Sequence, residues 1–144
     1  MNSYKVFNEE TANHVLVNEY KPGQGIMPHL DGPLFYPTIS TISLGSTTLL
    51  NFYRKAGEGE SLQFADRLVS SLFVQPRSLL VLKDDMYDKY LHGIEEIDQD
   101  VLSYKICNLP DPSVIGQVFP RSTRISLTIR HVPNTTKIKF KFGK

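Results

Sequence analysis

The sequence contains no tryptophan and only one cysteine, Cys107. A single cysteine cannot form a disulfide within the chain, and chains without disulfides are typical of reducing compartments. We therefore expect the protein in the cytoplasm and nucleus. The missing tryptophan argues against an immunoglobulin-type sandwich, whose core is built on a Cys…Trp…Cys pattern.

Long apolar runs and an excess of charge of one sign are missing as well. No run approaches the roughly 20 residues of a membrane-spanning helix, so no membrane partner is expected. Residues 1–12 carry charges where a secretory signal would have an apolar core. The 16 basic and 15 acidic side chains give a net charge of +1, so any contact with nucleic acid has to come from a local patch.

The chain does contain short stretches rich in β-branched and aromatic residues, separated by turns with glycine or proline. This arrangement predicts the strands of a sandwich or barrel. The predicted strands are His14–Tyr20, Thr38–Leu44, Thr47–Tyr53, Ser78–Leu82, Val101–Cys107 and Thr123–Val132. Helix is scarce, with a short amphipathic helix expected at Leu62–Phe73 and a helical turn at Asp84–Tyr90. We expect residues 1–144 to form one all-β domain, a double-stranded β-helix (jelly roll) with few short helices.

A histidine and an aspartate lie two residues apart in His29-Leu30-Asp31. Side chains two apart on an extended chain project from the same face, so His29 and Asp31 can approach one metal ion. His92 is the best third ligand. Two histidines and one carboxylate leave coordination positions open, which suits Fe(II) that also binds a co-substrate and O2. An ordinary turn histidine is the alternative interpretation of this pair.

The segment Arg124–Arg130 alternates strictly between polar and apolar residues. Its polar face consists of Arg124, Ser126, Thr128 and Arg130, and its apolar face of Ile125, Leu127 and Ile129. In an ordinary half-buried strand the two arginines would lie in water. In a barrel whose polar face points inward, they would offer guanidinium groups to a buried carboxylate. Asn18 and Tyr20 repeat the pattern, with two hydrogen-bonding side chains on one face.

Taken in chain order, these motifs resemble the signature of the AlkB family of Fe(II)/2-oxoglutarate-dependent oxygenases. The motifs are Asn18-x-Tyr20, His29-x-Asp31, His92 and Arg124-x5-Arg130. The segments HVLVNEYKPGQGIMPHLDGPLFYPTISTISLGS, PRSLLVL, YLHGI and TRISLTIRHVP resemble one vertebrate and plant branch of that family. The resemblance covers most of His14–Pro133.

The resemblance implies a ligand set for each co-substrate. Fe(II) would be bound by His29, Asp31 and His92, with O2 as a co-substrate. The co-substrate 2-oxoglutarate would be held by Asn18, Tyr20, Arg124, Ser126 and Arg130. Its distal carboxylate would bind Arg124 with help from the Tyr20 hydroxyl, while Arg130 would lie nearer the metal and contact Asp31. Ser126 stands where the family often has asparagine, and its reach is shorter.

The resemblance also implies an activity, the oxidative demethylation of N-alkylated DNA or RNA. Two alternatives stay open: a catalytically weak nucleic-acid-binding or scaffold member of the family, and an oxygenase that acts on protein side chains. Only 17 residues precede Asn18, so we expect the N-terminal nucleotide-recognition portion of the family to be missing. The tail Lys137–Lys144 alternates lysine with apolar residues, as in a protected edge strand or a path for a phosphate backbone.

Overall fold

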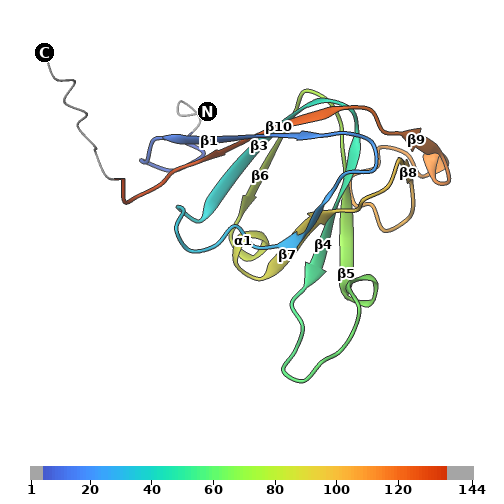
Figure 1. Cartoon of the computed structure of the whole chain (residues 1–144), viewed down its shortest axis with the longest axis horizontal. Coiled ribbons are helices and arrows are strands. Elements are labelled where there is room, and N and C mark those ends of the chain that lie inside the picture. Colours follow the sequence, from blue (N-terminus) through green and yellow to red (C-terminus); the bar gives the residue numbers. More distant parts are fainter. Residues whose placement is uncertain (1–4, 136–144) are drawn as a thin grey trace, which may run out of the picture.

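The computed structural model describes residues 5–135, and its strands form two facing sheets (Figure 1). The first sheet has the order β1 (His14–Tyr20), β10 (Arg124–Arg130), β3 (Thr38–Gly45), β6 (Ser78–Lys83). The second has the order β2 (Ile26–His29), β7 (Tyr90–Ile94), β4 (Thr48–Arg54), β5 (Leu68–Val74). The tail Lys137–Lys144, with its two alternative interpretations, lies outside the described residues.

The chain passes back and forth between the sheets, and every strand pair in them is antiparallel. Non-consecutive strands are therefore neighbours, as in a jelly roll, and the predicted all-β fold class is confirmed. A separate hairpin consists of β8 (Gln99–Val101) and β9 (Val118–Pro120). The helical segments are η2 (Phe64–Arg67), α1 (Asp85–Asp88) and η3 (Pro112–Val114). Among the residues that the structure describes, none of these is long and apolar enough to cross a membrane.

Most of the predicted strands are confirmed within two residues at each end. The strand at His14–Tyr20 has the predicted bounds, and the turn expected at Asp84–Tyr90 contains α1. The sequence interpretation missed β2 and β7, both short. Pro28 lies inside β2, and a proline normally indicates that a segment is not a strand. β2 is an edge strand of its sheet, and an edge strand tolerates proline.

The helix predicted at Leu62–Phe73 is wrong. The segment forms the short η2 and then the strand β5. Both faces of β5 are covered: Leu72 and Val74 face the core between the sheets, whereas Phe73 packs on the opposite face. A strand covered on both sides shows no simple alternation, and its apolar residues resemble a helical pattern.

The strand predicted at Val101–Cys107 is also wrong beyond its first residue. β8 ends at Val101, and the following residues form turns. Leu102 and Ile106 are buried there against Phe73, as two anchors of an irregular segment. Their apolar side chains reflect this packing and not a sheet.

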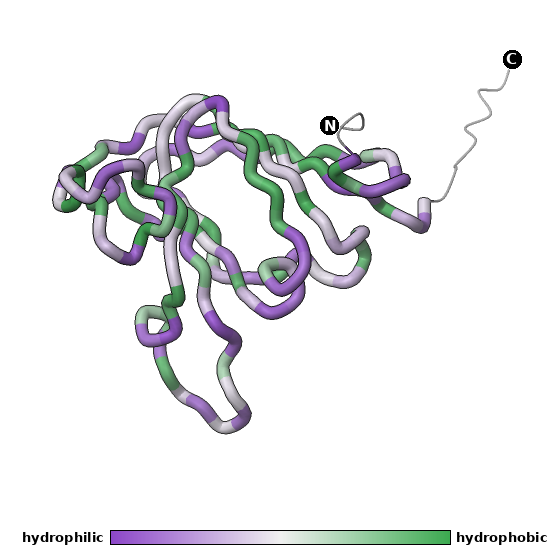
Figure 2. The backbone as a smooth tube through the Cα atoms, turned by 180° about the vertical axis from the view of Figure 1, so that it is seen from behind, coloured by the Kyte–Doolittle hydropathy of each residue, from purple (hydrophilic) through white to green (hydrophobic). Residues whose placement is uncertain are grey.

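Two hydrophobic clusters hold the sheets in place. The first lies between the sheets and contains Leu50, Phe52, Val74, Leu82 and Ile94. The second packs Phe73 against Leu102 and Ile106. Figure 2 shows apolar residues along the strands and hydrophilic stretches in the long loop between β4 and β5. The first cluster forms the apolar wall of the cavity described below.

The outer face of the first sheet is apolar and partly exposed. The register places Val17, Leu127, Ile42 and Leu79 in one row across its four strands. Val17 is 60% exposed and Leu79 is 52% exposed. The side chains of this row point away from the second sheet, so the polar residues of β10 point inward.

Candidate metal and co-substrate site

A cavity of about 100 Å³ lies between the two sheets. Its wall includes all eight residues that the sequence predicted for the site: Asn18, Tyr20, His29, Asp31, His92, Arg124, Ser126 and Arg130. The apolar part of the wall comes from both sheets, with Ile39 and Leu82 from the first and Leu50 and Ile94 from the second. The fold thus brings four separate sequence motifs to one site.

The polar face of β10 points into this cavity. Arg124 is 7% exposed and Arg130 is 9% exposed, and Ser126 and Thr128 between them are buried as well. The barrel-interior interpretation of this strand is therefore confirmed, and the alternative with arginines in water is wrong. A buried guanidinium is costly unless other groups pair with it, so the partners of these two arginines are informative.

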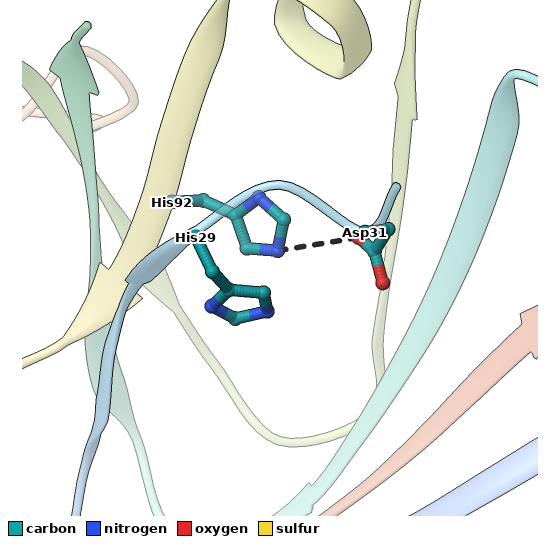
Figure 3. Close-up of side chains that lie close together, drawn as sticks. All are labelled: His29, Asp31 and His92. Carbon is teal, nitrogen blue, oxygen red and sulfur yellow. Dashed lines mark ion pairs between the residues drawn. The ribbon is translucent and has the colours of Figure 1, made fainter. Parts of the chain in front are cut away.

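His29, Asp31 and His92 converge at one end of the cavity (Figure 3). His29 and His92 are opposite each other on β2 and β7, with ring centroids 4.6 Å apart. Asp31 lies in the loop after β2, and its Oδ2 is 3.4 Å from His92 Nε2. One ligand atom from each residue lies within 4.8 Å of the other two. Two imidazoles and one carboxylate so placed can hold one metal ion.

Gly93 explains how His92 comes so close to His29. A Cβ atom at position 93 would lie 2.9 Å from the carbonyl oxygen of Ile26 and 2.9 Å from the nitrogen of Pro28. Real Cβ atoms essentially never come that close to backbone atoms. Glycine therefore lets β2 approach β7 at the point where each strand carries a candidate ligand.

The surroundings of both histidines bear on metal binding. The carbonyl oxygen of Met27 accepts a hydrogen bond of 2.8 Å from His29 Nδ1, so Nε2 is the nitrogen that His29 can offer to a metal. Burial lowers the pKa of His92 to about 4, against the opposing effect of Asp31. The His92 ring is therefore neutral at pH 7, as metal ligation requires.

Arg130 pairs with Asp31. Its Nη2 contacts Oδ1 of Asp31, so the contact expected from the resemblance is present. The guanidinium also lies over the Phe35 ring, 4.5 Å from its centroid. Arg130 therefore neutralises the carboxylate at the metal end of the cavity and leaves its other oxygen facing His92.

Arg124 differs from the other buried arginines that line or flank the site. Arg121 binds both carboxylate oxygens of Asp100, at 2.8 and 2.6 Å, and Arg130 has Asp31. Arg124 forms no ion pair anywhere in residues 5–135. Burial lowers its pKa, but a guanidinium remains charged in a protein. A buried cation without a carboxylate partner, facing a cavity, fits an anionic ligand.

Neighbouring strands position Arg124 and complete the polar end of the cavity. Tyr20 lies opposite Arg124 in the register, and the guanidinium carbon is 5.5 Å from the Tyr20 ring centroid. Burial raises the pKa of the Tyr20 hydroxyl, although Arg124, Asn18 and Ser126 beside it lower the pKa. The hydroxyl therefore stays protonated at neutral pH and can donate a hydrogen bond to a carboxylate.

Ser43 on β3 is a site residue that the sequence interpretation missed. Arg124 Nη2 donates a hydrogen bond of 2.8 Å to Ser43 Oγ, and Ser43 is 1% exposed. The register places Ser43 opposite Ser126 on β10. The polar residues Thr41 and Ser43 alternate with Ile42 and Leu44 along β3, and this alternation was the available signal.

Comparisons with known proteins agree with the fold and the site. The sequence model of the 2OG-Fe(II) oxygenase superfamily matches residues 2–130. The "Probable RNA/DNA demethylase ALKBH6" of Danio rerio is 54% identical over 142 residues, which are 96% of this chain and 61% of that protein. The "Uncharacterized protein L905" of Acanthamoeba polyphaga mimivirus is 33% identical over 86% of this chain and 50% of that protein.

A solved structure is similar as well. The structure of OsALKBH1 matches with a TM-score of 0.52 over 90% of this chain and 57% of that chain, at 18% identity, which supports the fold alone. The chain thus spans between half and 61% of the length of the two curated relatives above. The chain belongs to the 2OG-Fe(II) oxygenase superfamily, and within that class to the AlkB family.

Proposed function

We propose that the chain is an Fe(II)- and 2-oxoglutarate-dependent dioxygenase that removes N-alkyl groups from DNA or RNA. The observation that carries this proposal is one cavity with a candidate metal-binding group at one end and, at the other, a buried arginine that has no carboxylate partner among residues 5–135. A dicarboxylate that binds a metal through one end needs a cation for its second carboxylate. Arg124 is such a cation.

Iron would be held by His29, Asp31 and His92, which supply two neutral imidazole nitrogens and one carboxylate oxygen. Such a set would leave coordination positions open for a co-substrate and O2. Bound Fe(II) and 2-oxoglutarate would supply the oxidation of a carbon–hydrogen bond by O2, with release of succinate and carbon dioxide.

The side chains of the cavity would bind and orient the co-substrate and exclude water. Arg124 would take the distal carboxylate of 2-oxoglutarate, with the Tyr20 hydroxyl as a second donor and Ser43 holding the guanidinium. Arg130 pairs with Asp31 and so holds the carboxylate in its orientation. The apolar wall from the cluster between the sheets limits water around the reacting groups. Asn18 and Ser126 flank the Tyr20 hydroxyl and would help to hold the same co-substrate.

The proposal of a nucleic-acid substrate is supported by the similar proteins and by general chemistry. The printed name of the Danio rerio relative assigns RNA or DNA demethylation to that protein. A methyl group on the pairing edge of a base is inaccessible inside a stacked duplex, so the substrate would be single-stranded or have its base flipped out. The net charge of +1 leaves few cations to neutralise phosphates, so we expect weak binding with a shallow dependence on salt.

The test is to measure succinate and formaldehyde together, with Fe(II), 2-oxoglutarate and an N-methylated single-stranded oligonucleotide. The proposal predicts that both products form in equal amounts and that the unmethylated oligonucleotide yields no formaldehyde. A methylated peptide pool serves as the comparison substrate. Succinate without any formaldehyde from DNA or RNA would contradict the proposed substrate, whereas the absence of succinate under all conditions would contradict the oxygenase itself.

A further inference from the structure

The short helix α1 lies against the loop that carries Asp31. The Tyr87 hydroxyl donates a hydrogen bond of 2.6 Å to the carbonyl oxygen of Gly32, the residue directly after Asp31. Gly32 has a φ of +88°, in the left-handed region that favours glycine. The hydrogen bond and the backbone conformation of Gly32 together define the course of the chain next to the candidate metal ligand.

The rest of α1 fixes the place of Tyr87. Its neighbour Met86 packs against the core between the sheets. Successive side chains on a helix point about 100° apart, so anchoring Met86 directs Tyr87 away from the core centre. At the end of the helix, Lys55 Nζ donates a hydrogen bond of 2.7 Å to the carbonyl oxygen of Asp88. Tyr87 is thus held from two sides.

The turn before α1 is strained. Asp84 has a φ of +53° and a ψ of −136°, a conformation that residues other than glycine rarely adopt. The carbonyl oxygen of Asp84 accepts a hydrogen bond of 2.9 Å from the backbone nitrogen of Tyr87. The strained residue therefore turns the chain from β6 into the helix that reaches the Asp31 loop.

We propose that Tyr87 is a positioning residue for the metal ligand Asp31 and acts through Gly32. This inference rests on the proposed function, in which Asp31 binds Fe(II). One oxygen of Asp31 contacts Arg130, and the other lies 3.4 Å from His92 Nε2, so a shift of the adjoining backbone would displace the carboxylate at the candidate metal site. Hydrogen-bonding partners outside a ligand set typically change metal affinity 10–100-fold.

The main test is Tyr87→Phe, which removes one oxygen atom and keeps the ring. Co(II) serves as the probe, with its visible absorption recorded during titration of the metal-free chain. We expect Co(II) to bind about 10-fold more weakly or worse, with an altered spectrum at saturation. The control is Tyr104→Phe, because Tyr104 is 82% exposed. A Tyr87→Phe chain with wild-type Co(II) affinity and spectrum would overturn the positioning role, whatever its thermal stability.

Gly32→Ala tests the other end of the same hydrogen bond. No heavy atom lies within 4 Å of an added Cβ, so alanine fits, but the φ of +88° is strained for it and should shift the carbonyl oxygen. We expect a comparable loss of Co(II) affinity, and a double variant that loses less than the product of the two single losses. A double variant whose loss of Co(II) affinity equals the product of the two single losses would show that Tyr87 and Gly32 act independently on the metal site.

The two proposals fail in different ways. A wild-type chain that does not bind Co(II) at all contradicts the proposed function, and with it this inference. Wild-type binding together with an unaffected Tyr87→Phe variant contradicts only the positioning role of Tyr87.

Discussion

Arg130 on β10 of the first sheet and Asp31 in the loop after β2 form a buried ion pair that joins the two sheets at the metal end of the cavity. Their side chains are 11% and 5% exposed. Removal of one partner from a buried pair leaves an uncompensated charge, which typically destabilises a protein by about 3–5 kcal/mol. The pair therefore supports the fold as well as the site.

The first prediction follows from that pair. Arg130→Met should lower the free energy of unfolding of the metal-free chain by about 3–5 kcal/mol, measured by urea titration. Arg54→Met is the matched control, because Arg54 pairs with Glu60 at the surface, where their side chains are 44% and 22% exposed. Its effect should be much smaller. Equal effects of the two substitutions would show that the Arg130 pair adds nothing through burial.

The Arg54–Glu60 pair gives a second prediction, on pH. Hydrogen bonds from Arg54 and from the backbone of Gly57 lower the pKa of Glu60 from 4.5 to about 2. A carboxyl with a lowered pKa contributes stability above its unfolded pKa, and this contribution is lost as the pH falls through its folded pKa. The loop after β4 should therefore keep its Glu60 contacts until the pH falls below 4.5, with loss centred near 2. Side-chain NMR of Glu60 measures this directly, and a midpoint near 4.5 would contradict it.

A third prediction concerns 2-oxoglutarate. Arg124→Ala should raise the Kd for 2-oxoglutarate by at least tenfold, because a charge-assisted hydrogen bond contributes about 1.5–3 kcal/mol. Arg124→Lys should restore little, since a lysine cannot reproduce the planar fork of a guanidinium. The measurement is calorimetric titration with Mn(II) in place of iron. Unchanged affinity in Arg124→Ala would remove the assigned role.

Ser43 supplies a finer version of the same test. Ser43→Ala removes the acceptor for Arg124 Nη2, and we expect the Kd for 2-oxoglutarate to rise by roughly 2–10-fold, which corresponds to one net hydrogen bond. Ser70→Ala is the control, because Ser70 Oγ bonds the carbonyl oxygen of Lys105 on a segment outside the cavity. Equal affinities in the two variants would mean that Arg124 keeps its orientation without Ser43.

The parts of the site that could be predicted from the sequence are those that show a pattern within a few neighbouring residues. His29 and Asp31 lie two apart, and β10 alternates, so each face is defined before any sheet is built. Alternation along β3 indicates a polar face at Ser43, but its contact with Arg124 depends on which strands are neighbours. The contact of Tyr87 with Gly32 depends on where α1 packs, and no local pattern gives either arrangement. The same limit applies to β5, whose two covered faces arise only when Leu102 and Ile106 pack behind it.

The last prediction concerns the metal ligands. His29→Ala or Asp31→Ala should abolish Fe(II)-dependent formation of succinate, because two remaining ligands cannot hold the ion in place. His29→Ala should keep the β fold, measured by circular dichroism, since among the described residues the only hydrogen bond of the His29 side chain is to the backbone carbonyl of Met27. Asp31→Ala should also lose stability, because it leaves Arg130 buried without its partner. His131→Ala serves as the control: its ring contacts Thr11 and Glu10, and it does not line the cavity. Retained succinate formation in His29→Ala, at a rate near that of the His131→Ala control, would show that the iron lies elsewhere.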